Sequence, residues 1–302
     1  MENRRKCILV WMAEFSFSES AGVLYVPQPW ASSPEAQHGF RRMLATHAAP
    51  LLICDYDGTL APFREDKMQA APYPGVVDRL ACIAAGPTRL AFVSGRPVGE
   101  LIMLLPLAAE AELWGMHGRE HRTADGTYDL IEPTAAQRMA LDQAQAELYN
   151  HGLKASVERK AASVALHWRT LADAGEGARL KQFERLALET FSPHVGEHAL
   201  ALLPFDGGLE LRAEDHTKGH AVEALLAGAD GHASAFLGDD TTDEDAFRVL
   251  RARGGLTLLV REPPRPSHAG FSLKPPAELL AFLDSWISAL AVTGSPTTRL
   301  SH

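Results

Sequence analysis

The sequence predicts an α/β protein: a doubly wound parallel-sheet core with an inserted, smaller α+β unit. The first observation is a series of short apolar runs that end in Gly and polar residues, each followed by an amphipathic helical pattern. The second is a change of character over residues 123–206, where two long helical patterns lie among shorter strand-like stretches. The third is the return of the strand-and-helix pattern further along the chain. Together these observations favour a discontinuous, Rossmann-like core.

The composition indicates a globular protein large enough for one main core and a second unit. The chain has 302 residues, of which 46% are hydrophobic and 22% are charged. A formal net charge of -9, without clusters of Lys and Arg, argues against nucleic-acid binding. No apolar run approaches the roughly eighteen residues of a membrane span.

The cysteines and the first residues bear on the cellular compartment. Cys7, Cys54 and Cys82 are widely spaced and form no Cys-x-x-Cys pair, so neither a disulfide framework nor a zinc site is indicated. The basic residues before Cys7 resemble the start of a secretory leader, but Glu14 interrupts the apolar stretch that follows. We therefore expect a cytoplasmic protein.

The first half of the core is expected over residues 41–122. Residues 1–40 show no sustained period and carry several Pro residues, so we expect a loosely ordered extension there. A strand at about 50–55 and a helix over 76–85 form the first crossover unit. The second begins with a strand at 90–93, and a third strand ends near Trp114.

The inserted unit is expected over residues 123–206, and the core over 207–291. The insertion holds helices near 135–150 and 178–191, with strands between and after them. The core then resumes with alternating elements: a helix from 217, a strand at 233–237, a helix from 242, a strand at 256–260 and a helix over 276–290. Residues 292–302 are expected to be a flexible tail.

Asp55 and Asp57 directly follow the first strand. Ligands of parallel sheets gather beyond the carboxyl ends of the strands, which is where Asp55 lies. Two carboxylates two residues apart repel each other unless a cation lies between them, and oxygen ligands favour a hard ion such as Mg2+. An Asp-rich turn, with Gly58 supplying a positive φ, is the alternative.

Three later segments occupy comparable places. Ser94 follows the second strand, where its hydroxyl and the adjacent amides can hold phosphate oxygens, although Ser-Gly is also an ordinary turn. Lys218 begins a helix, where a cation opposes the dipole and suits an anionic ligand better than helix stability; a solvated Lys is the alternative. Asp239 ends a strand and is a candidate metal ligand, whereas Thr242, Asp243 and Glu244 are expected to cap the next helix.

These segments, in this order, resemble the four motifs of the haloacid dehalogenase superfamily of phosphohydrolases. They are Asp55-Tyr56-Asp57-Gly58-Thr59, Ser94-Gly95-Arg96, Lys218 and Gly238-Asp239-Asp240. More narrowly, further segments are similar to the trehalose-6-phosphate phosphatase family: Gly115–Glu120, Glu158–Lys160 with His167–Arg169, Gly208–Arg212 and Gly238–Phe247. The resemblance covers roughly residues 48–290. Two departures, Tyr56 where Phe is frequent and Thr241 where Arg is common, remove no reacting group.

The resemblance implies a Mg2+-dependent phosphatase that converts trehalose 6-phosphate to trehalose and phosphate, the last step of trehalose biosynthesis. Asp55 would become an aspartyl phosphate, Asp57 would act as general acid and base, and Ser94 and Lys218 would hold phosphate oxygens. The Mg2+ would be held by Asp55, by Asp57 through its backbone carbonyl, and by Asp239. The partner implied is the small-molecule substrate; a trehalose-6-phosphate synthase, if one binds, would be a separate chain.

The insertion would be a cap that closes over the site and reads the sugar. Its candidates for substrate binding are Glu158, Lys160 and Glu210, and Gly95 and Arg96 are the candidates from the core. Four other residues are left out as structural: His117, His167, Trp168 and Arg169.

Two other readings stay open. A related phosphatase acting on sucrose phosphate or mannosyl phosphoglycerate would share the core motifs, although the three cap residues argue against it. A non-catalytic protein that binds a sugar phosphate is the second reading. Retention of both Asp55 and Asp57 argues against it, because a binding module needs no acid–base carboxylate.

Overall fold

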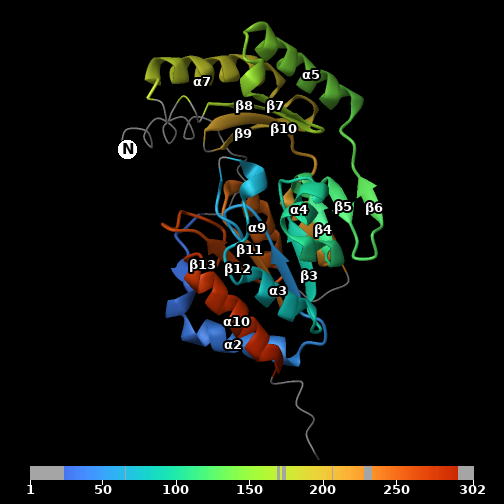
Figure 1. Ribbon diagram of the computed structural model, residues 1–302, viewed down its shortest axis with the longest axis vertical. Helices are drawn as coiled ribbons and strands as arrows, with labels where there is room; N and C mark the ends of the chain where they lie inside the picture. Colours follow the sequence, from blue (N-terminus) through green and yellow to red (C-terminus); the bar gives the residue numbers. More distant parts are fainter. Residues whose placement is uncertain are drawn as a thin grey trace, which may run out of the picture.

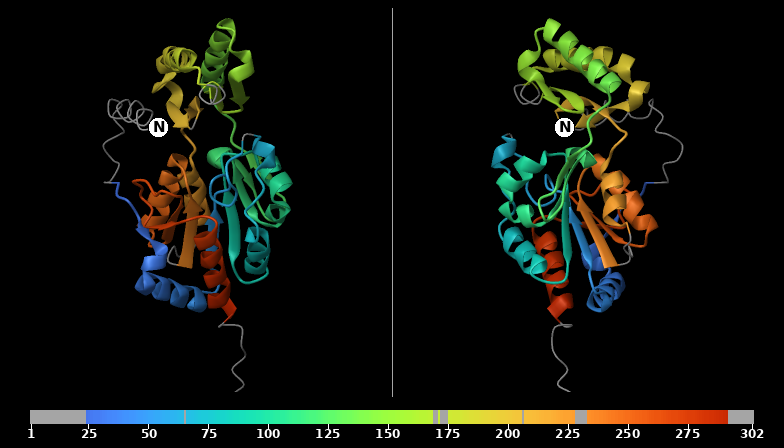
Figure 2. Two further views of the ribbon diagram at one scale, coloured as in Figure 1. Left: turned by 60° about the vertical axis from the view of Figure 1, so that its left-hand side comes forward. Right: turned by 90° about the vertical axis from the view of Figure 1, so that its right-hand side faces the viewer.

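The computed structural model describes residues 24–64, 66–168, 171, 175–205, 207–227 and 233–291. These residues form a large nine-stranded sheet with helices on both faces, and a separate four-stranded sheet with helices on one face (Figures 1 and 2). The predicted doubly wound α/β core with an inserted α+β unit is therefore confirmed. The predictions for residues 1–23 and 292–302 lie outside the described residues.

The large sheet has the strand order β1-β13-β12-β11-β2-β3-β4-β5-β6. In this spatial order, every pair of neighbouring strands from β1 at one edge as far as β4 is parallel. β5 and β6 follow β4 at the other edge and pair antiparallel. The bounds are β1 Gln28–Pro29, β2 Leu51–Cys54, β3 Arg89–Val93, β4 Glu112–Gly115, β5 Glu120–Arg122, β6 Tyr128–Leu130, β11 Ser234–Gly238, β12 Leu256–Val260 and β13 Phe271–Leu273. The strands that precede Asp55, Ser94 and Asp239 are thus adjacent, with β2 between the other two.

Helices cover both faces of this sheet because successive side chains of a buried strand point to opposite sides. In β2, Leu52 and Cys54 join one hydrophobic cluster, whereas Leu51 and Ile53 join the other. The first cluster is closed by α2 (Pro34–Thr46), α3 (Val76–Ala84), α4 (Val98–Leu104) and α10 (Ala277–Ala291). The second is closed by α8 (Lys218–Leu225) and α9 (Glu244–Ala252).

The expectation that residues 1–40 form an extension outside the core is wrong for residues 24–40. β1 pairs in parallel with β13 and so extends the sheet, and α2 packs beside α10. The Pro residues that suggested a loose segment are compatible with order here. Pro29 lies in an edge strand, and Pro34 occupies the first turn of α2, where its missing amide hydrogen costs little.

Trp30 anchors this segment to the core. Its side chain is buried, and its ring meets Phe271, Phe282 and Phe40 in edge-on arrangements at centroid distances of 5.0, 6.1 and 6.4 Å. Aromatic pairs of this kind favour edge-to-face geometry and bury a large apolar area. The segment is therefore part of the main hydrophobic core.

The predicted boundaries of the inserted unit shift at both ends. β5 and β6 belong to the large sheet, so the core continues to residue 130 and not to 122. At the other end, β10 (Gly208–Ala213) pairs with β8 (Ser163–His167) and β9 (Leu200–Phe205), so the insertion ends at Ala213 and not at 206. A short alternating strand fits either sheet by its pattern alone, and only its pairing decides. We call residues 135–213 the cap and the other described residues the core.

The cap is a two-layer unit. Its antiparallel sheet has the order β7-β8-β10-β9, in which β7 is Val157–Lys160. The helices α5 (Ala135–Asn150) and α7 (Gly177–Phe191) cover the face that points away from the core, which leaves the other face over the ends of the core strands (Figure 1). Apolar residues between the layers, including Leu148, Leu166 and Phe191, are fully buried and give the cap its own hydrophobic core.

Two linkers, residues 131–134 and 214–217, join the cap to the core, and Arg119 connects them. This buried guanidinium donates to the carbonyl oxygen of Ile131 at 3.2 Å and pairs with the Asp215 carboxylate. Gln137 of α5 also donates to Asp215, at 3.2 Å. Both linkers between the core and the cap are thus bound to the same guanidinium, that of Arg119.

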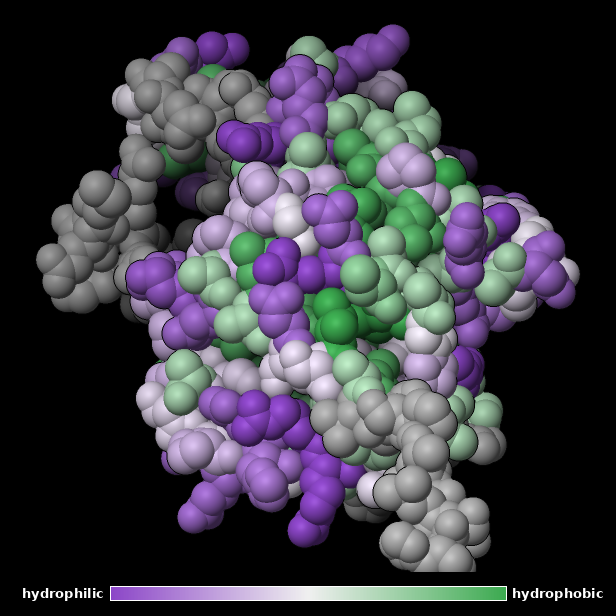
Figure 3. All heavy atoms as spheres, turned by 60° about the horizontal axis from the view of Figure 1, so that its bottom comes forward, coloured by the Kyte–Doolittle hydropathy of each residue, from purple (hydrophilic) through white to green (hydrophobic). Residues whose placement is uncertain are grey.

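Figure 3 shows the molecule with the lower end of Figure 1, away from the cap, turned toward the viewer. Hydrophilic side chains surround a hydrophobic area in the middle of this view. Much of any folded surface is apolar, so this area alone identifies no partner. Among the described residues, no helix is both long and apolar enough to cross a membrane.

Candidate active site

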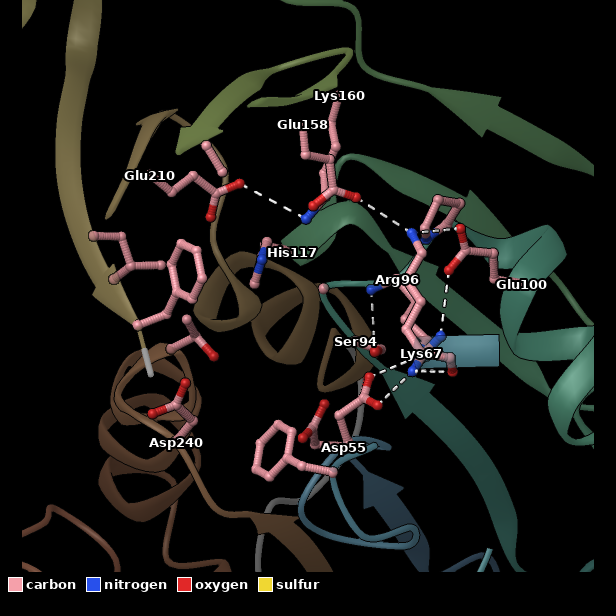
Figure 4. A pocket seen from close by; sticks show the side chains of 18 of the residues that line it. Asp55, Lys67, Ser94, Arg96, Glu100, His117, Glu158, Lys160, Glu210 and Asp240 are labelled. Carbon is pink, nitrogen blue, oxygen red and sulfur yellow. Dashed lines mark hydrogen bonds and ion pairs between the residues drawn. The ribbon is translucent and has the colours of Figure 1, made fainter. Parts of the chain in front are cut away.

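A pocket of about 260 Å3 lies between the carboxyl ends of the core strands and the cap sheet (Figure 4). Asp55 follows β2, Ser94 follows β3 and Asp239 follows β11, and the backbone amide of Asp55 donates to Leu237 of β11 at 2.8 Å. Parallel pairing in register brings these three strand ends together. The pocket contains all ten predicted site residues: Asp55, Asp57, Ser94, Gly95, Arg96, Glu158, Lys160, Glu210, Lys218 and Asp239.

At the base of the pocket, Lys218 lies between two carboxylates. Its Nζ donates to Asp55 Oδ1 at 2.8 Å and to Asp243 Oδ1 at 2.7 Å, and all three side chains are buried. The other oxygen of Asp243 accepts from the backbone amides of Asp239 and Asp240, at 2.9 and 3.0 Å. Asp243 therefore fixes Lys218 and the turn that carries Asp239.

The prediction that Asp243 takes part in capping is confirmed, but this is only half of its role. In a capping box at the 3-10 turn before α9, the Asp240 carboxylate accepts from the amide of Thr241 at 2.7 Å, and the Asp243 carboxylate accepts from the amide of Asp240 at 3.0 Å. The other Asp243 oxygen points inward to Lys218. A run of acids before a helix gives the same sequence signal for either role. The one sequence signal for an inward-pointing Asp243 side chain is its spacing, four residues beyond Asp239.

Burial dominates the electrostatics of this group. It raises the pKa of Asp55 to about 7, although the charge of Lys218 acts in the opposite direction. Burial and the nearby Asp55 also raise the pKa of Asp239 well above its usual range. Burial alone would lower the pKa of Lys218, but the carboxylates of Asp243 and Asp55 outweigh it and raise that pKa. The ammonium is therefore charged at neutral pH.

The donor set beside Lys218 fits a divalent cation. Ligand atoms of Asp55, Asp239 and Asp243 lie within 4.8 Å of one another. Both oxygens of Asp243 already have hydrogen-bond partners. Within the part of the chain that the structure describes, Asp55 Oδ2 and Asp239 Oδ1 have only the Thr59 hydroxyl, at 3.4 Å from each. Carboxylate oxygens are the ligands that Mg2+ prefers, and a cation there would offset the repulsion between Asp55 and Asp239.

Gly58 makes room for this arrangement. Its φ is +79°, and a Cβ built on it would lie 2.2 Å from Asp239 Oδ2. Any larger residue would both strain the backbone and displace the Asp239 carboxylate. The positive φ predicted at Gly58 is thus present, and it belongs to the acidic site and not merely to a turn.

Asp57 points to a different partner, Arg96. Nε and Nη2 of Arg96 donate to the two Asp57 oxygens, each at 2.6 Å, and the guanidinium also reaches Glu100 at 3.3 Å and the Lys67 carbonyl oxygen at 2.8 Å. All three guanidinium nitrogens therefore have protein partners. The backbone amide of Arg96 donates to Ser94 Oγ at 3.2 Å, which orients the hydroxyl of that residue.

His117, which the sequence predicts to be structural, lies in the pocket. A Cβ added at Gly95 would lie 2.6 Å from its ring, so Gly95 must lack a side chain for the imidazole to lie over it. The His117 backbone has a φ of 58° and is held by its amide, which donates to Ser94 at 2.9 Å. Burial, followed by the charge of Arg212, lowers the pKa of His117 well below its usual value, so the ring is neutral.

The cap contributes two glutamates and a lysine to the pocket, together with His167. Lys160 Nζ lies 3.8 Å from Glu210 Oε1, which also accepts from the Ser163 hydroxyl at 2.5 Å. Glu158 Oε2 lies 3.2 Å from His167 Nε2, and this contact lowers the pKa of Glu158 to about 2. The cap thus presents two carboxylates and an ammonium to the pocket.

The other residues named from the sequence lie in different places. His167 lines the pocket beside Glu158, and Trp168 packs partly buried against the hydrophobic core of the cap. Arg169 lies outside the described residues. Two further pocket residues, Lys67 and Glu100, had no sequence signal, because a single charged residue in a loop or an acid in the first turn of a helix is ordinary.

Comparison with known proteins identifies the family. The family model described as trehalose-phosphatase matches residues 53–276. The trehalose-phosphate phosphatase of Mycobacterium ulcerans is 31% identical over 261 residues, which are 81% of this chain and 63% of that protein. That of Mycobacterium tuberculosis is 33% identical over 253 residues, 78% of this chain and 60% of that protein. The chain thus spans less than two thirds of these relatives.

Solved structures agree on the fold. The trehalose-6-phosphate phosphatase of Aspergillus fumigatus superposes with a TM-score of 0.60 at 23% identity, covering 86% of this chain and 99% of that chain. The C-terminal domain of the Candida albicans enzyme gives a TM-score of 0.67 at 18% identity, covering 88% and 99%. The family match covers both the acidic site of the core and the cap residues that face it, and on this ground the chain belongs to the trehalose-phosphatase family.

Proposed function

We propose that this protein hydrolyses trehalose 6-phosphate to trehalose and phosphate, with Mg2+ and through a phosphorylated Asp55. The observation that carries the proposal is the two-ended pocket. Its core end combines a buried carboxylate with Lys218, and its cap end presents Glu158, Lys160 and Glu210. A sugar phosphate has the matching two ends: an anionic group and a set of hydroxyls. The names of the mycobacterial and fungal relatives point to the same substrate.

The first step forms a bond between Asp55 and phosphorus. Lys218 donates to Oδ1 of Asp55 and so would orient the carboxylate for attack. Lys218, the Ser94 hydroxyl and the amides that follow it would hold the phosphate oxygens and favour in-line geometry. As the new bond forms, the bond between phosphorus and the sugar oxygen breaks.

Mg2+, held by Asp55 and Asp239, would supply charge compensation between the carboxylate nucleophile and the phosphate dianion. The Asp57 backbone carbonyl remains our third proposed ligand. This assignment suits the side-chain geometry, because the Asp57 carboxylate is directed to Arg96 and not to Asp239. The Asp57 side chain stays available for proton transfer.

Asp57 is the proposed general acid and base. It would protonate the departing sugar oxygen and then accept a proton from the water that cleaves the aspartyl phosphate. Arg96 fixes both of its oxygens and so sets its direction. Arg96 would thus act on the substrate chiefly by holding Asp57.

The test is phosphate release from a panel of phosphate esters, with and without Mg2+. We expect trehalose 6-phosphate to be preferred over sucrose 6-phosphate, glucose 6-phosphate and mannosyl phosphoglycerate, and chelation to stop turnover. Asp55→Asn is the control, which should bind trehalose 6-phosphate with Mg2+ and release no phosphate. Preference for another ester would identify that ester as the substrate in place of trehalose 6-phosphate. Binding without turnover by the wild type would indicate a sensor.

A further inference from the structure

Lys67 joins the core to the cap across the pocket. It begins the 3-10 helix η2 (Lys67–Gln69), in the core loop between β2 and α3. Its Nζ lies 2.9 Å from Oε1 of Glu100 in the core and 3.3 Å from Oε1 of Glu158 in the cap. Figure 4 shows the ammonium between the two carboxylates. The single positive charge of Lys67 therefore pairs with one carboxylate of the core, Glu100, and with one of the cap, Glu158.

The Lys67 backbone is fixed by Arg96. Nη2 of Arg96 donates to the Lys67 carbonyl oxygen at 2.8 Å, and Nη1 reaches the same Glu100 that pairs with the Lys67 side chain. The Asp66 side chain accepts from the amide of Met68 at 2.9 Å and stabilises the turn. A continuous series of polar contacts therefore runs from Asp57 through Arg96 and Lys67 to Glu158.

The carboxylates of Glu100 and Glu158 both pair with the Lys67 ammonium, so removing this ammonium affects both of them. Glu100 and Glu158 each lose an ion pair, and their negative charges are then left to repel each other across the boundary between core and cap. Oε2 of Glu158 is still held by His167, so the carboxylate stays ionised within the cap. The repulsion would therefore act on the cap and turn it away from the core at this side of the pocket.

We propose that Lys67 is a specificity-determining positioning residue that sets the distance between the sugar-binding end and the phosphate-binding end of the pocket. The inference rests on the proposed function, because it takes Glu158 as a contact of the sugar. A substrate that spans both ends depends on this distance. A small aryl phosphate, which engages only the core end, does not. Lys67 thereby favours substrates long enough to reach Glu158.

The experiment compares Lys67→Met, which keeps the apolar stem and removes the charge, with a matched control, Lys274→Met. Lys274 pairs with Glu262 on the surface and does not line the pocket. With trehalose 6-phosphate, Lys67→Met should lower kcat/KM by roughly two- to tenfold, as expected for the loss of two partly exposed ion pairs. With p-nitrophenyl phosphate it should match the wild type, and the control should match it on both substrates.

A double variant separates positioning from a merely structural role. If Lys67 acts through Glu158, Lys67→Met should have no further effect on trehalose 6-phosphate hydrolysis in a Glu158→Gln background. Raising the salt concentration should lower the wild-type preference for trehalose 6-phosphate toward that of Lys67→Met, whose own preference stays flat. Additive losses, or a parallel loss with p-nitrophenyl phosphate, would overturn the proposal.

Failure of the proposed function gives a different result. In that case the wild type releases no phosphate from trehalose 6-phosphate but still hydrolyses p-nitrophenyl phosphate. Hydrogen exchange then decides the role of Lys67 without any substrate: residues 131–134 and 214–217, which link cap and core, should exchange faster in Lys67→Met than in the wild type or Lys274→Met. Equal exchange in all three proteins would refute the role of Lys67 in positioning the cap.

Discussion

Arg96 grips Asp57 with two hydrogen bonds of equal length, 2.6 Å, from two nitrogens of one guanidinium. This fork fixes the plane of the carboxylate as well as its position. The side chain of Arg96 is only 7% exposed, so solvent does little to weaken the pair. The orientation of the Asp57 carboxylate is therefore set by the protein itself.

Arg96→Lys should keep the positive charge but lose the fork. Because hydrogen bonds to a charged group contribute about 1.5–3 kcal/mol, kcat for trehalose 6-phosphate should fall by on the order of ten- to a hundredfold. The loss should be smaller for p-nitrophenyl phosphate, whose leaving group needs little protonation. Steady-state kinetics on both substrates checks this. Asp57→Asn is the reference: Arg96→Lys should add little to it, and a large additional loss would give Arg96 a separate role.

Asp243→Asn should weaken both the fold and the site. Only one side-chain oxygen remains, so either Lys218 or the amides of Asp239 and Asp240 lose an acceptor in a buried place. A buried polar group without its partner costs about 1–3 kcal/mol of unfolding free energy. Urea denaturation measures this, and phosphatase activity should fall as well. Asp240→Asn, at an exposed cap where Asn and Asp are equivalent, is the control and should be nearly neutral in stability.

His117→Asn should change the pH dependence of stability. The pKa of His117 is held well below its ordinary value of 6.5, chiefly by burial. Below pH 6.5 the unfolded chain therefore binds a proton that the folded protein does not, and the unfolding free energy falls by up to about 1.4 kcal/mol per pH unit. Asn tolerates the positive φ and does not titrate.

Urea denaturation of both proteins at pH 7 and pH 5 measures this difference. The wild type should lose more unfolding free energy than His117→Asn over this range, whereas above pH 7 the two curves should run parallel. Other histidines titrate equally in both proteins and cancel in the comparison. Parallel curves down to pH 5 would mean that His117 is readily protonated in the folded state.

Trp30→Ala should destabilise the core by about 3–5 kcal/mol, the usual cost of removing a large buried aromatic side chain. The ring lies against Phe271 and Phe282, so its loss leaves a cavity beneath the edge of the large sheet. Thermal denaturation measures the change. Tyr25→Ala, at a more exposed position of the same segment, is the control and should have a much smaller effect. A loosely attached segment would instead make both substitutions nearly neutral.

The sequence predicted those parts of the site that depend on strand ends. Asp55, Ser94 and Asp239 follow three apolar runs, and parallel pairing of those strands places the residues after them at one edge of the sheet. Asp243 and Lys67 could not be found this way. The first turns inward because Lys218 arrives from another helix, and the second matters because the cap brings Glu158 above it.

The same distinction explains the errors in the fold. The main strands are apolar on both faces and were recognised by composition alone, whereas β1 is two residues long and contains Pro29. Its place depends on the edge that β13 offers, which no local pattern records. The assignment of β10 to the cap depended in the same way on its pairing with β8 and β9.

Arg119 gives the cap a pivot. Because Ile131 and Asp215 are both bound to one guanidinium, the two linkers are held together where the cap joins the core, and a movement of the cap would be a turn about that point. In a rotation, atoms far from the pivot travel further than atoms beside it. A small twist at Arg119 would thus widen the far side of the entrance most, while the linkers themselves would hardly move.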